Sequence, residues 1–280
     1  MSAVTRRVPA RLVPGRLVLG TDPVRAEPAG PGSLWLVDAR GQGEAALRLA
    51  PTVLDAGERQ RAAAFRWESD RRCWVAARVG LRLLLGARQE VAPAAVRLER
   101  EPCAVCGGAD GRPVAPDSGL WFSVSHSSDL ALLAFGAAPL GVDVEALPDP
   151  ELVSELAGWL HVREVAELEA GPEAERPAAF ARTWVRKEAY LKGLGVGLAR
   201  DPALDYLGAG PVASAPSGWE VADVAVPAGF AGAVARTAVA LTAAARTAVT
   251  GPAGIPSGSA HTTDVSPSSG SSSRAEVAKR

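Results

Sequence analysis

The stretch FARTWVRKEAYLKGL, residues 180–194, decides how this chain is interpreted. Its apolar residues recur at helical spacing and glycines follow it, so we expect a helix that ends in a tight turn. Trp184, Glu188 and Lys192 are four residues apart and share one stripe of that helix. A glutamate four residues before a lysine is the favourable order for a helical ion pair, so the stripe alone indicates a surface salt bridge.

A second group of charged residues precedes this helix in the pentapeptide GVDVE, residues 141–145. In a strand, side chains alternate between faces, so Val142 and Val144 are expected in the core and Asp143 and Glu145 on the other face. Two neighbouring carboxylates repel each other unless a cation lies between them, and Mg²⁺ prefers such ligands together with phosphates and water. Alone, the pattern favours an edge strand with a solvated acidic face.

The third group is FSVSHS, residues 122–127, which places Ser125 and His126 at the end of an expected strand. Hydroxyls and a histidine at a strand end can hold a phosphate. Alone, the group is more typical of a capped turn. A serine nucleophile is disfavoured because adjacent positions rarely face each other and no G-x-S-x-G motif surrounds the serine.

The rest of the chain alternates between strand and helix patterns. We expect an irregular segment at 1–32, an N-terminal half at 33–138, a C-terminal half at 139–248 and a disordered Ser/Gly/Pro-rich tail at 249–280. The expected strands are 33–38, 121–124, 130–136, 140–145, 221–226 and 233–241, and the expected helices are 53–64, 70–85, 151–160, 163–169 and 180–194.

Composition narrows the class of protein. The 280 residues carry a formal net charge of −1, which argues against a nucleic-acid-binding protein. Three cysteines do not suggest a disulfide framework, and neither a signal peptide nor a long apolar span is seen, so a cytoplasmic location without a membrane anchor is expected. Cys103-x-x-Cys106 could be half of a zinc knuckle, but no second pair exists, so an ordinary loop is favoured.

Taken together and in this order, FSVSHS, GVDVE and WVRKEAYLKGLGVGL resemble the motifs of the 4′-phosphopantetheinyl transferase superfamily, in its larger, broad-specificity (surfactin-synthetase-activating) type. The resemblance covers residues 33 to 245. It implies an α+β fold in which two similar halves form a pseudo-dimer, with coenzyme A bound in the cleft between them. For each of the three motifs, the resemblance also favours the functional interpretation over the structural one that the motif alone suggests.

The resemblance assigns roles residue by residue. It implies Mg²⁺, with Mn²⁺ as an alternative ion, on Asp143, Glu145 and Glu188. Glu188 would also be the general base, and Lys192 would contact the phosphate and assist the leaving group. The residues implied to contact coenzyme A are Arg78, Arg112, Ser125, His126, Lys187 and Lys192, of which Arg112 replaces the family's lysine in a G-K-P turn.

The implied activity is transfer of 4′-phosphopantetheine from coenzyme A to a serine of an apo acyl or peptidyl carrier protein. Secondary-metabolite synthases, polyketide or nonribosomal peptide, are the favoured source of that carrier, with a fatty-acid carrier as the alternative. A hydrolase of a coenzyme A-type pyrophosphate and a non-catalytic carrier-binding module are the competing functions. A monomer is expected, because both halves lie in one chain.

Overall fold

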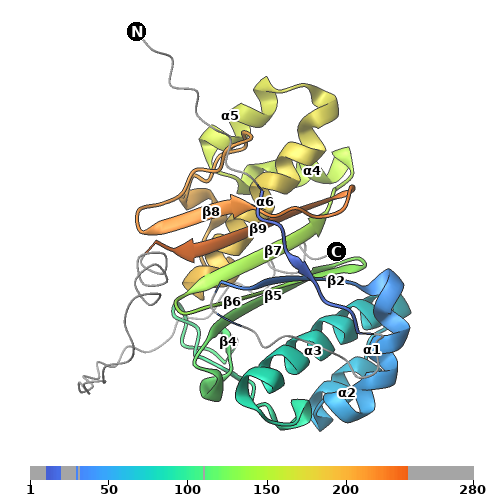
Figure 1. Ribbon diagram of the computed structural model, residues 1–280. Coiled ribbons are helices and arrows are strands. Elements are labelled where there is room, and N and C mark those ends of the chain that lie inside the picture. Colours follow the sequence, from blue (N-terminus) through green and yellow to red (C-terminus); the bar gives the residue numbers. More distant parts are fainter. Residues whose placement is uncertain (1–10, 20–29, 31, 110, 239–280) are drawn as a thin grey trace, which may run out of the picture.

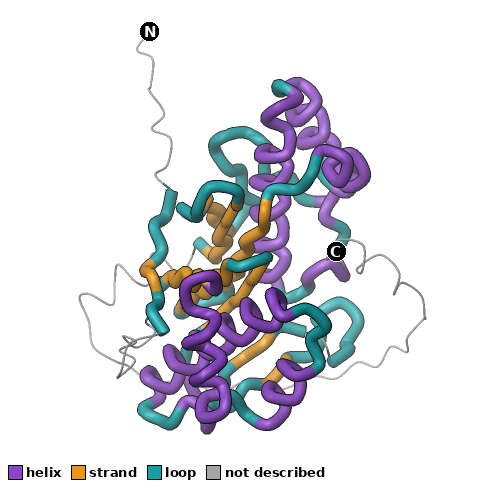
Figure 2. The backbone as a smooth tube through the Cα atoms, turned by 90° about the vertical axis from the view of Figure 1, so that its right-hand side faces the viewer, coloured by secondary structure: helices purple, strands orange, loops and turns teal. Residues whose placement is uncertain are grey.

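The computed structural model describes residues 11–19, 30, 32–109 and 111–238, and the expected tail at 249–280 lies outside them. The described part is a mixed α+β fold in which strands lie between a lower and an upper group of helices (Figure 2). The strands are β1 Gly15–Arg16, β2 Leu34–Asp38, β3 Glu99–Arg100, β4 Pro113–Val114, β5 Trp121–Ser127, β6 Leu130–Gly136, β7 Leu140–Ala146, β8 Trp219–Asp223 and β9 Phe230–Thr237. The α-helices are α1 Ala39–Val53, α2 Ala56–Ala63, α3 Glu68–Gln89, α4 Pro150–Leu156, α5 Val162–Ala170 and α6 Arg176–Leu194.

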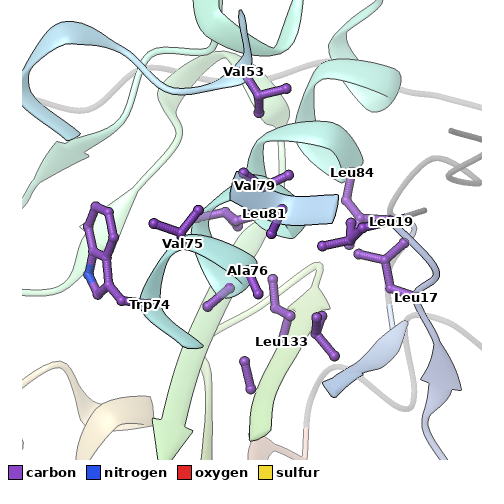
Figure 3. Close-up of a cluster of buried hydrophobic side chains, with 14 of the residues drawn as sticks. Leu17, Leu19, Val53, Trp74, Val75, Ala76, Val79, Leu81, Leu84 and Leu133 are labelled. Atoms are coloured by element: carbon purple, nitrogen blue, oxygen red, sulfur yellow. The ribbon is translucent and has the colours of Figure 1, made fainter. Parts of the chain in front are cut away.

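The first sheet has the order β1-β2-β6-β5, and its central pairs are antiparallel. Helices α1 to α3 cover one face of it (Figure 1). The core beneath them joins Leu81 and Leu84 of α3 to Leu133 of β6, and Leu17 and Leu19 of the N-terminal segment complete it (Figure 3). Residues 11–19 therefore contribute to the core, although this segment was expected to be irregular.

The second sheet has the order β7-β9-β8 and is antiparallel throughout. Alternation along its strands separates two environments. Val142 and Val144 of β7 pack against Leu132 of β6 in a core shared by the two sheets. Ala233 and Ala235 of β9 face the other way, where they pack against α6.

Helix α6 approaches β7 closely because of one glycine. A Cβ atom at Gly141 would collide with the carbonyl oxygen of Ala189 and the amide nitrogen of Gly193, both on α6. The bare backbone of β7 therefore touches the helix at this point. Asp143 lies on the same face of the strand, two residues further along.

One helix was missed in the sequence, and another starts three residues later than expected. Residues 39–53 form α1, although Gly41, Gly43 and Pro51 weaken the helical pattern. Asp38 caps its N-terminus, and Gly43 allows close contact with Arg72 of α3, so tertiary packing outweighs propensity. The helix expected at 53–64 begins later, as α2. No helix in the described residues is long and apolar enough to cross a membrane.

Candidate active site

The two sheets meet where the edge of β7 faces a row of serine side chains on β5. Ser123 Oγ accepts a hydrogen bond from the amide nitrogen of Val142 at 3.1 Å, and Ser127 Oγ accepts one from Ala146 at 3.2 Å. The serine between them, Ser125, instead donates to Oδ1 of Asp143 at 2.6 Å. Ser125 therefore faces the buried Asp143 carboxylate, and Ser127 also donates to the Glu145 carboxylate. The bond of Ser123, by contrast, is to the backbone.

Ser125 and Asp143 form a triad with Lys192 of α6. The ammonium of Lys192 lies 2.5 Å from Oδ1 of Asp143 and 3.1 Å from Oγ of Ser125. β7 is an edge strand of its sheet, as the pentapeptide alone suggests, but Asp143 is 0% exposed, so the solvated acidic face is wrong. The close approach at Gly141 brings the helix lysine within reach of this buried carboxylate.

Glu145 and Glu188 add negative charge to the same place. Burial and, after it, the Asp143 carboxylate raise the pKa of Glu145 to about 7, against the Ser127 hydrogen bond and the Lys192 ammonium, which lower it. Burial lowers the pKa of Lys192, but the carboxylates of Asp143, Glu188 and Glu145 outweigh burial and raise it overall. One ammonium thus lies near three carboxylates. We call Asp143, Glu145, Glu188 and Lys192 the acidic cluster, and this cluster has an excess of negative charge.

The acidic cluster has the donor chemistry of a hard-cation site. Oδ2 of Asp143 is buried without a hydrogen-bond partner in the described residues, and an orphaned carboxylate oxygen is costly unless something positive satisfies it. All the donors are carboxylate oxygens, which Mg²⁺ prefers. Across the described residues, however, no three His, Cys, Asp or Glu side chains converge closely enough to enclose a metal ion, and the Lys192 ammonium occupies Oδ1. The chemistry fits such an ion, but an assembled metal centre is not present.

Lys187 lies in a different environment from Lys192. Its ammonium pairs with Glu164 of α5 at 2.7 Å and donates to the carbonyl oxygens of Pro202 at 2.8 Å and Asp205 at 2.6 Å. An ammonium has three donors, and all three are used here. The structure therefore leaves Lys187 no donor for a phosphate, which conflicts with the contact that the motif implies.

Arg112 lies at the C-terminal end of α6, where it would have to lie to share a site with this helix. It donates to the carbonyl oxygen of Leu194 at 3.2 Å, and its guanidinium lies 4.5 Å from the ring centre of Trp121. Gly195, with φ of +79°, leaves the room that this guanidinium fills. Two of its nitrogens, Nε and Nη1, are buried without a hydrogen-bond partner in the described residues, although Nε lies 3.7 Å from a Glu101 oxygen.

The other implied coenzyme A contacts are less closely associated with the acidic cluster. Arg78 pairs with Glu58 of α2 at 2.9 Å and lies over Trp74 of its own helix, so these contacts belong to the helical layer. His126 is exposed and follows Ser125 on β5, so alternation directs it to the opposite face from the triad.

Sequence reasoning missed part of the seam. Ser123 and Ser127 were not singled out, although the alternating serines in FSVSHS are the signal that one strand face is lined with hydroxyls. Glu164, which holds Lys187, was also missed, because nothing local marks its partner on another helix. In the described residues neither loop cysteine forms a disulfide, and Cys103 is buried whereas Cys106 is exposed.

Comparison with known proteins agrees with this geometry. The family model described as the 4′-phosphopantetheinyl transferase superfamily matches residues 139–209, which include β7 and α6. The 4′-phosphopantetheinyl transferase HetI of Nostoc is 34% identical over 173 residues, covering 60% of this chain and 70% of HetI.

Other relatives match shorter stretches. The 4′-phosphopantetheinyl transferase AcpT of Salmonella typhimurium is 37% identical, covering 31% of this chain and 47% of AcpT. The 4′-phosphopantetheinyl transferase gsp of Aneurinibacillus migulanus is 27% identical, covering 31% of this chain and 36% of its own length.

These matches define the protein as a group-transfer enzyme. More specifically, the chain belongs to the 4′-phosphopantetheinyl transferase superfamily.

Proposed function

We propose that the protein transfers 4′-phosphopantetheine from coenzyme A to a serine of an apo acyl or peptidyl carrier protein, which yields the holo carrier and adenosine 3′,5′-bisphosphate. The observation that carries the proposal is the triad of Ser125, Asp143 and Lys192, beside Glu145 and Glu188. The Lys192 ammonium lies beside an excess of carboxylates, and these charged residues belong to the segment 139–209 that the family model matches.

The reaction divides naturally among these groups. The carrier serine oxygen attacks the phosphorus that bears the pantetheine arm, a new phosphorus–oxygen bond forms, and the bond to the bridging pyrophosphate oxygen breaks. Glu188 accepts the serine proton, directly or through water. Lys192 stabilises the negative charge that develops on the departing adenosine bisphosphate. No covalent enzyme intermediate is needed.

Mg²⁺, or Mn²⁺ in its place, would be held by Asp143, Glu145 and Glu188. The support is the orphaned Oδ2 of Asp143 and the charge excess of the acidic cluster. When bound, such an ion neutralises pyrophosphate charge. Asp143 can serve as a ligand through Oδ2 while Oδ1 stays with the Lys192 ammonium, for which the phosphates of coenzyme A offer a further partner.

Coenzyme A would be held on both sides of the seam between the sheets. Arg112 is the best supported contact, because its buried guanidinium has nitrogens without partners in the described residues. Ser125, His126, Lys192 and Arg78 remain proposed contacts, and so does Lys187, although its ammonium is fully occupied. We further propose that residues 33–138 and 139–248 form the two halves of a pseudo-dimer of the larger family type, with the cleft between them.

The partners follow from this assignment. We propose a cytoplasmic monomer that binds coenzyme A and an apo carrier protein, neither nucleic acid nor membrane. Carriers of secondary-metabolite synthases, polyketide or nonribosomal peptide, are the favoured substrates, and a fatty-acid carrier is the alternative. Nothing in the described residues specifies the carrier further.

Incubation with coenzyme A, Mg²⁺ and a panel of apo carriers tests the proposal. We expect the carrier to gain the mass of one phosphopantetheinyl group on its serine, and the gain to disappear with EDTA and return with excess Mg²⁺. A carrier whose serine is replaced by alanine is the control. Release of free 4′-phosphopantetheine without a carrier would identify a hydrolase, and a stable complex without a mass change would identify a binding module.

A further inference from the structure

Glu164 is a buried carboxylate that joins three parts of the C-terminal half. It is 0% exposed, and its Oε2 accepts hydrogen bonds from the amide nitrogen of His161 at 3.0 Å and from the Lys187 ammonium at 2.7 Å. Its Oε1 accepts bonds from the amide nitrogens of Leu207 at 2.7 Å and Gly208 at 3.1 Å. One side chain thus ties together α5, α6 and the loop that follows α6.

Lys187 completes this unit from the helix side. It is 1% exposed, and its two remaining donors bind carbonyl oxygens of the 202–205 segment. One negative and one positive charge balance, and the donors and acceptors around them are used. Such a fully satisfied buried pair is rigid, because a change in any member leaves a buried polar group unpaired.

This anchoring fixes the rotation of α6 about its axis at the turn that carries Glu188. Successive residues of an α-helix are about 100° apart around its axis, so the direction of Lys187 determines that of Glu188, the next residue. On its other side, the helix is pressed against the bare backbone of β7 at Gly141. The turn that carries Glu188 is therefore held from two directions, by the Glu164 pair and by β7.

We propose that Glu164 and Lys187 are positioning residues for transfer: they set the orientation of Glu188 toward the acidic cluster and do not touch coenzyme A. The proposal rests on the proposed function, since it concerns the rate of that reaction. It differs from the role that the motif implies for Lys187, which is a contact with the phosphates. The two roles predict opposite kinetic effects.

Steady-state kinetics of Lys187→Met, Glu164→Gln and the double variant separate these roles. If the pair positions Glu188, kcat falls roughly 10- to 100-fold, as expected for a displacement of about 1 Å, while KM for coenzyme A changes less than about twofold. The double variant should be no slower than the worse single variant, because both changes break one unit. A tenfold or larger rise in KM with kcat preserved would overturn the proposal and assign Lys187 to the phosphates.

Two controls separate positioning from general loss of structure. Leu84 of α3 is 0% exposed and lies in the core between the first sheet and its helices, away from α6. Leu84→Ala should lower the melting temperature at least as much as Lys187→Met, yet keep kcat per folded molecule within about twofold. Lys187→Arg keeps the charge and should recover part of the lost kcat.

Folding of the variants is followed by circular dichroism. If Lys187→Met and Glu164→Gln do not fold, Glu164→Asp keeps the charge and shortens the side chain, and it should still lower kcat selectively. Unchanged kcat per folded molecule in an active protein would refute the positioning role. An inactive wild-type protein would instead refute the proposed function, so the two failures are distinguishable.

Discussion

Lys187 and Lys192 lie five residues apart on α6, and each is bonded to a buried carboxylate, yet their surroundings differ. Around Lys187, the ammonium pairs with Glu164, the carboxylates of Asp205 and Asp201 also act on it, and every donor is used. Around Lys192, whose side chain is 30% exposed, one ammonium meets three carboxylates, and an oxygen of Asp143 is left without a partner. The difference teaches that hydrogen-bond completion, rather than residue type, separates a structural ion pair from a candidate site.

The largest expected effect is at Glu188. Glu188→Gln keeps the shape of the side chain but removes its charge and its ability to accept a proton, so carrier modification should slow by at least roughly 100-fold. The melting temperature should stay within a few degrees, because the variant relieves repulsion among the carboxylates. Mass spectrometry of the carrier and a thermal melt measure the two quantities. Near-normal turnover would remove Glu188 from its assigned role.

An intermediate effect is expected at Lys192. Lys192→Met leaves the acidic cluster without its cation, so the melting temperature should fall by roughly 5 °C, a loss limited by the partial exposure of the lysine. Added Mg²⁺ should raise it by more in this variant than in the wild type, because the ion replaces the missing charge. Equal Mg²⁺ effects in both proteins would argue against a cation site at the acidic cluster. Lys187→Met, measured alongside, should show no such Mg²⁺ dependence.

The smallest effect compares two serines of the seam. Ser125→Ala removes hydrogen bonds to two charged groups, so transfer should slow roughly tenfold. Ser123→Ala removes one bond to a backbone amide and should cost about 1 kcal/mol of stability with kcat unchanged. Kinetics and urea unfolding on both variants check the pair. Equal kinetic effects would show that the seam acts as a whole rather than through its middle position.

Much of the fold could be predicted from hydrophobic periodicity. The strands expected at 130–136 and 140–145 match β6 and β7 to within a residue, and the helix expected at 180–194 is the C-terminal part of α6. The helix at 39–53 could not be seen, because its glycines and proline are tolerated only through packing against α3. The helix expected at 70–85 is longer at both ends, because α3 spans Glu68–Gln89 with Trp67 as its N-cap residue.

The candidate site was predictable in composition but not in connectivity. Motif order identified Asp143, Glu145, Glu188 and Lys192, and their mutual electrostatic influence agrees with that grouping. The sequence indicated a helical pair of Glu188 with Lys192, and the structure adds Asp143 on β7, whose Oδ1 lies 2.5 Å from the lysine ammonium. Helical spacing describes only neighbours on one helix, so partners supplied by another strand, or by Glu164 of α5 in the case of Lys187, stay hidden until the fold is known.

The serine seam has a consequence for how such a protein can diverge. A junction between sheets that consists of main-chain hydrogen bonds is insensitive to substitution, since every residue offers the same amide and carbonyl. Here β5 and β7 are connected through the hydroxyls of Ser123, Ser125 and Ser127, so one codon change can loosen or retune the junction without rebuilding either sheet. The way the two sheets pack together can therefore change through single substitutions at this boundary.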